Sequence, residues 1–75
     1  MLRMTPDNQA RAAAGSLAME AYQHAKGLIE SPSLQSPQET LTDLLSDLRH
    51  FADAVGIDFD AADRMAQDHY EFESW

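Results

Sequence analysis

The sequence contains no cysteine, which excludes disulfide bonds and thiolate metal sites and fits a reducing compartment. It also contains no apolar run approaching the roughly 20 residues needed to span a bilayer. The amino-terminal MLRMTPDNQ has no apolar core of the kind found in signal peptides. We therefore expect a cytoplasmic protein that neither crosses a membrane nor is secreted.

Basic residues are scarce: five Lys and Arg stand against 13 Asp and Glu, and the net charge is −8. Acids and bases cancel over residues 1–35, so all of the net negative charge falls in residues 36–75. An acidic surface repels phosphate backbones, so we expect no direct binding of nucleic acid. The same surface would attract a basic protein and steer its approach.

Glycine and proline are also rare, with three of each, while alanine and leucine are frequent, which favours helix. The sequence predicts an all-α fold in a single domain, 1–75. Its parts are helix one (about 6–29), a linker (31–36), helix two (about 37–55) and helix three (about 59–73).

The second predicted helix carries signals at both ends. Ser36 can cap its first turn, Pro37 suits the first helical position, and Glu39 can complete a capping box. Gly56 follows the helix, where a left-handed ending needs a residue without a Cβ. Asp58 can cap the third helix two residues later. Because this connection is so short, we expect helices two and three to form an antiparallel αα-hairpin.

Apolar residues recur at helical spacing in all three segments. Helix two carries Leu41, Leu44, Leu45, Leu48, Phe51, Ala52 and Val55. Helix three carries Phe59, Ala62, Met65, Ala66, His69 and Phe72. The expected inner face of helix one is Ala10, Ala14, Leu17, Ala21, Ala25 and Leu28, with Tyr22 on the outer side. A chain of this size buries only about 60% of its extended surface, so we expect a homodimer.

Two groups of residues are candidates for binding a partner. Glu39, Asp43 and Asp47 recur every four residues, about 6 Å apart along one helix face. This row is either a docking face for a basic partner, for example as a DNA mimic, or a solvated face that keeps the protein soluble. Near the carboxyl end, Tyr70, Phe72 and Trp75 either close a core or self-dimer, or anchor another protein.

Signals for catalysis and for metal binding are weak. Two pairs could supply metal ligands or hydrogen-bond at the core edge: His50 with Asp53, and His69 with Glu73. Asp60 and Asp63 have the spacing of a metal-dependent nucleotide phosphohydrolase, a second alternative function. The sequence has no nucleophile elbow and no Gly-rich phosphate loop. We therefore expect a protein that is not an enzyme and has no cofactor.

Residues 41–70 carry a pattern DLLxDLxH, then GxDF, then HY. The matching residues are Asp43, Leu44, Leu45, Asp47, Leu48 and His50, then Gly56, Asp58 and Phe59, then His69 and Tyr70. The pattern resembles small helical proteins encoded by phages, prophages and plasmids. Some short phage proteins of this kind are quorum-sensing anti-activators, as found in Pseudomonas phages. These are helical dimers that bind a LuxR-type transcription regulator and a pilus assembly ATPase.

The resemblance implies a protein from a mobile element, acting in the cytoplasm of a bacterial host. Our leading hypothesis is a non-enzymatic homodimer that binds and inhibits a host protein, such as a LuxR-type regulator or a pilus ATPase. The alternative is an acidic inhibitor of a nucleic-acid-binding host protein, for example an anti-CRISPR protein. The resemblance supplies no individual binding residues.

Overall fold

In the computed structural model of the chain, residues 6–27 and 35–73 are described. These residues form three α-helices and contain no strand, which confirms the all-α prediction. The helices are α1 (Pro6–Gly27), α2 (Pro37–Val55) and α3 (Phe59–Glu73). The expected end of helix one at residues 28–29, and residues 31–34 of the expected linker, lie outside the described residues.

The predicted end signals of α2 are present. The backbone N–H of Glu39 donates to Ser36 Oγ at 3.2 Å, and the backbone N–H of Ser36 donates to Glu39 Oε1 at 3.2 Å. This reciprocal pair is the expected capping box. At the other end Gly56 has φ 77° and ψ 29°, the left-handed conformation. The next N–H, of Ile57, donates to Ala52 O at 2.9 Å, so this carbonyl of the last turn has a partner.

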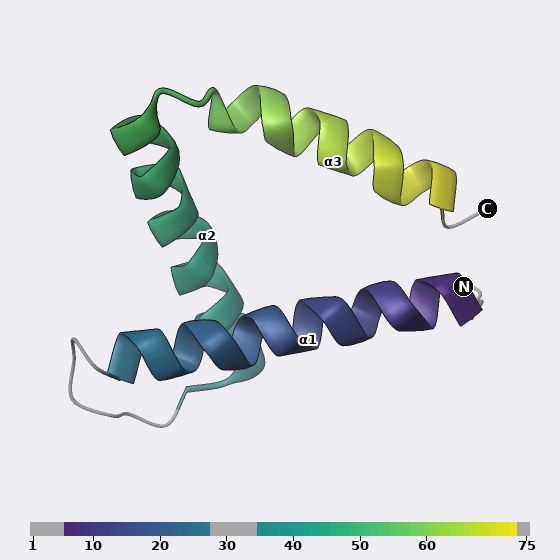
Figure 1. Cartoon of the computed structure of the whole chain (residues 1–75), viewed down its shortest axis with the longest axis horizontal. Helices are drawn as coiled ribbons and strands as arrows, with labels where there is room; N and C mark the ends of the chain where they lie inside the picture. Colours follow the sequence, from purple (N-terminus) through teal and green to yellow (C-terminus); the bar gives the residue numbers. More distant parts are fainter. Residues whose placement is uncertain (1–5, 28–34, 74–75) are drawn as a thin grey trace.

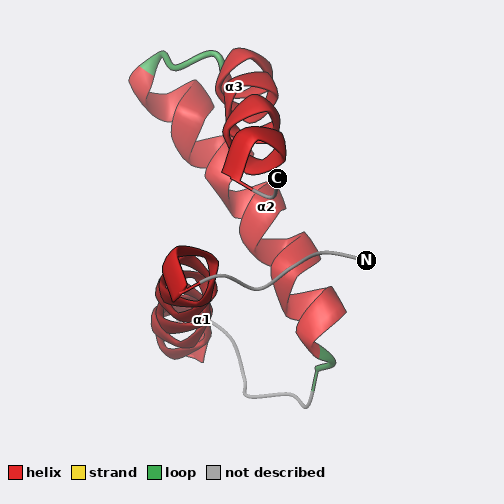
Figure 2. Cartoon of the chain, turned by 90° about the vertical axis from the view of Figure 1, so that its right-hand side faces the viewer, coloured by secondary structure: helices red, strands yellow, loops and turns green. Residues whose placement is uncertain are grey.

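The turn leads directly into α3, whose first turn Asp58 caps by accepting the backbone N–H of Ala61 at 3.0 Å. In Figure 1, α2 and α3 diverge from this turn and form a V, so that α3 does not lie alongside α2 over its length. Figure 2 shows α1 and α3 placed toward opposite ends of α2. The three helices therefore form an open frame, in which α2 connects α1 at one end to α3 at the other.

Little apolar surface is buried within this frame. Among the described residues, the only buried hydrophobic side chain is Ala52, 3% exposed, and the only buried polar one is Thr40, 1% exposed. The radius of gyration is 14.2 Å, whereas a compact domain of this length has about 11 Å. Within one chain, the leucines and aromatics of α2 and α3 therefore do not form an interior, because the two helices diverge from their turn.

The orientation of α1 also differs from the expectation. Leu17, placed on the expected inner face, is 65% exposed. The partly buried side chains of the second half of α1 are Met19, Tyr22 and Lys26. Two of these bond to acidic side chains of α2, as described below, and such directional contacts fix the rotation of a helix that offers mainly alanine for packing. Tyr22 thus lies toward α2 and not on an outer side.

Candidate functional site

The junction between α1 and α2 is built around Asp43. Its carboxylate forms an ion pair with Lys26 Nζ and accepts a hydrogen bond from Gln35 Nε2 at 3.0 Å. These hydrogen bonds, first that of Lys26 and then that of Gln35, hold the pKa of Asp43 below its ordinary value, because both favour the charged form. Asp43 therefore stays ionised to lower pH than an isolated carboxylate.

One helical turn further along α2, Asp47 has a similar role. The Tyr22 hydroxyl donates to Asp47 Oδ2 at 2.6 Å, and Lys26 Nζ lies 5.9 Å from the centre of the Tyr22 ring. Lys26 and Tyr22 of α1 thus engage two members of the predicted acidic row. The third member, Glu39, forms the capping box. All three carboxylates are accordingly used within the chain.

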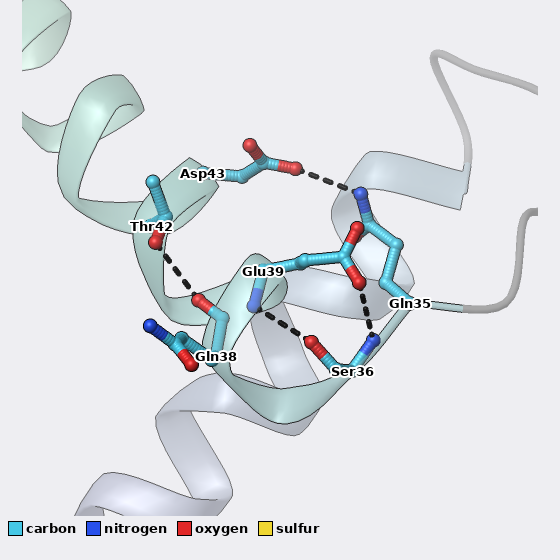
Figure 3. A pocket seen from close by; sticks show the side chains of 6 residues that line it. All are labelled: Gln35, Ser36, Gln38, Glu39, Thr42 and Asp43. Carbon is cyan, nitrogen blue, oxygen red and sulfur yellow. Dashed lines mark hydrogen bonds between the residues drawn. The ribbon is translucent and has the colours of Figure 1, made fainter.

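A shallow hollow of about 260 Å³ lies at the start of α2. It is lined by Gln35, Ser36, Gln38, Glu39, Thr42 and Asp43 (Figure 3). The polar groups that line it bond to one another: the Thr42 hydroxyl, for example, donates to Gln38 O at 2.9 Å. Its volume is below the range of about 300–1,000 Å³ typical of small-molecule pockets. Its geometry therefore gives no support to a substrate site.

The open side of the frame is bridged by side chains. Arg11 Nε forms an ion pair with Glu73 Oε2 at 2.8 Å, and Asn8 Nδ2 donates to Glu73 O at 3.0 Å. These contacts join the first half of α1 to the last turn of α3. Beside them, Phe72 is 84% exposed and Tyr70 is 50% exposed. Two of the three predicted aromatic anchors are thus presented at the surface, and the third, Trp75, lies outside the described residues.

The candidate metal ligands are not gathered into one site. Within residues 6–27 and 35–73, no three His, Asp or Glu side chains are close enough together to hold a metal ion. Glu73 is engaged with Arg11. Asp60, from the predicted phosphohydrolase pair, forms an ion pair with Arg49 Nη1 at 2.9 Å. The Arg49 guanidinium also lies 4.4 Å from the centre of the Phe59 ring, so this contact joins α2 to α3.

Arg11, Lys26, Tyr22 and Arg49 are residues that sequence reasoning missed. Each holds one helix to another through a carboxylate. The composition gives one hint of such contacts, since the chain has only five Lys and Arg for 13 Asp and Glu. In such a chain each base has several acids to pair with, and the tertiary structure selects which.

No helix among the described residues is long and apolar enough to cross a membrane. Comparison with known proteins finds no matching family model, no matching curated protein and no matching solved structure.

Proposed function

We propose that this chain is a non-enzymatic homodimer that binds and inhibits a host protein in the bacterial cytoplasm. The candidate targets are a LuxR-type transcription regulator and a pilus ATPase. The observation that supports this proposal most is the exposure of large apolar side chains on α2 and α3, from 40% at Leu48 to 84% at Phe72. Exposed apolar surface of this extent is typical of proteins that act by association.

The target-binding surface is assigned to the carboxyl end of α3. Phe72 is the most exposed large apolar side chain among the described residues. Tyr70 is half exposed nearby, and aromatic side chains often supply most of the energy of an interface. The contacts of Glu73 with Asn8 and Arg11 tie this end of α3 to α1. These contacts therefore hold in place the end of α3 that carries Tyr70 and Phe72.

Charge favours a basic target surface, since the whole net charge of −8 falls in residues 36–75. The alternative, an inhibitor of a nucleic-acid-binding protein, has less support. Asp43 and Asp47, which would imitate phosphates, are already engaged by Lys26 and Tyr22.

The test is a binding titration of the purified chain against each purified candidate target. Phe72→Ala is expected to weaken binding at least about tenfold, or about 1.4 kcal/mol. Leu17→Ala is the matched control, because Leu17 is also largely exposed, at 65%, but lies on α1. The proposal fails if neither target binds, or if the two variants weaken binding equally.

A further inference from the structure

The exposed apolar side chains of α2 form one continuous surface. They are spaced by three or four residues, so they share a single face of the helix. We call them the leucine stripe: Leu41, Leu45, Leu48, Phe51 and Val55, each 40–56% exposed. With α1 and α3 in place, each of these side chains stays about half exposed.

We propose that the leucine stripe packs against the leucine stripe of a second copy of the chain. The two α2 helices run antiparallel, and a two-fold axis passes near Leu48. This inference rests on the homodimer proposed above and assigns its interface.

The surface area of the chain supports a second copy as the occupant. A single chain exposes 6439 Å². A compact monomer of 8.4 kDa exposes about 4,600 Å². The excess, about 1,800 Å² per chain, lies within the area that each subunit of an obligate homodimer buries, since such interfaces total about 2,000–5,000 Å². The excess is therefore of the size that one symmetric partner buries.

The distribution of charge along α2 selects the antiparallel direction. Up to Asp47 the helix carries three acids and no base (Glu39, Asp43 and Asp47), whereas beyond it Arg49 and Asp53 balance each other. Parallel packing would bring the two acidic stretches together. Antiparallel packing separates them and also opposes the two helix dipoles. Leu48 is the middle residue of the stripe, so an isologous contact centres on it.

Because the chain has no cysteine, single-cysteine variants test this geometry directly. Leu48→Cys is expected to form a disulfide-linked dimer on mild oxidation, since two residues at the axis lie within disulfide reach. Leu41 lies seven residues from the axis, so its two copies are about 21 Å apart. Leu41→Cys alone is expected not to cross-link, but a mixture of Leu41→Cys with Val55→Cys is. Leu17→Cys, on α1, is the control and is expected to stay monomeric on a denaturing gel.

Sedimentation equilibrium on the unmodified chain supplies the second readout. The expected mass is twice the 8.4 kDa of one chain. Leu48→Asp is expected to weaken dimerisation at least about 100-fold, because it buries a charge beside its own symmetry mate. Leu17→Asp is expected to leave dimerisation unchanged. If Leu48→Asp fails to fold, the cysteine variants, which preserve an apolar side chain at this position, decide.

Three results would overturn the inference: a monomeric chain at all concentrations, a dimer that Leu48→Asp and Leu17→Asp affect equally, or cross-linking of Leu41→Cys with itself.

The dependence of binding on salt distinguishes the homodimer from the complex with the proposed host target. Two subunits of charge −8 repel, so added salt is expected to tighten the homodimer. Binding of a basic target would instead weaken. Failure of target binding with an intact stripe dimer would remove only the proposed inhibition.

Discussion

Replacing Gly56 by alanine tests the turn on which the path from α2 to α3 depends. Gly56 has φ 77°, a conformation that costs an L-residue with a Cβ about 1–2 kcal/mol. A Cβ at this position would have no heavy atom within 4 Å. The expected loss therefore comes from the backbone alone and not from a clash. For a domain of this size, it corresponds to a decrease in Tm of about 5–15 °C.

Gly15→Ala is the matched control and is expected to have the opposite sign. Gly15 lies inside α1, and a Cβ added to it would likewise meet no heavy atom within 4 Å. Alanine is favoured over glycine in a helix interior by about 0.5–1 kcal/mol. We therefore expect the Tm of Gly15→Ala to rise by about 2–8 °C. The same chemical change thus separates a left-handed turn from a helical site.

Thermal unfolding followed by circular dichroism at 222 nm measures both effects. All samples need the same protein concentration, because self-association raises the Tm by mass action. Gly56→Asn gives an intermediate case, since asparagine tolerates the left-handed region better than alanine. A Tm that rises for Gly56→Ala as it does for Gly15→Ala would refute the reasoning. That result would mean that α2 and α3 form one continuous helix.

Two further predictions concern the side chains that hold α2 at its beginning. Ser36→Ala removes the acceptor for the Glu39 N–H, and we expect the free energy of unfolding to fall by about 1 kcal/mol, measured by urea denaturation; no change would show that the capping box contributes nothing. The pKa of Asp43 is lowered in the folded chain, chiefly by Lys26. The ion pair between them therefore stabilises the fold above the unfolded pKa of about 3.9, and this stabilisation is lost as pH falls through the folded pKa. Asp43→Asn should therefore lower the urea midpoint at pH 6 and flatten its decline below about pH 4, and an unaltered acid limb would contradict this.

The local structure of α2 could be predicted because its determinants are close together in the sequence. Ser36 and Glu39 lie three residues apart, so the capping box needs no tertiary partner. Gly56 permits the left-handed ending without help from a distant residue, and Asp58 then caps α3. The all-helical fold follows from the same kind of local information, together with the apolar spacing. Of the candidate site residues, the sequence also identified Phe72 and Tyr70 as surface anchors or core, and the structure presents both at the surface.

Only the tertiary structure decided how the helices meet and what their polar side chains do. The alanine face of α1 has no strong preference for one neighbour, so the contacts of Lys26 and Tyr22 with Asp43 and Asp47 set its rotation. These contacts link residues 17 and 25 positions apart, a separation that helical periodicity does not address. For the same reason, periodicity located the leucine stripe but not what covers it. A spacing of three and four residues specifies a face of a helix, whereas its partner depends on contacts between distant segments or between chains.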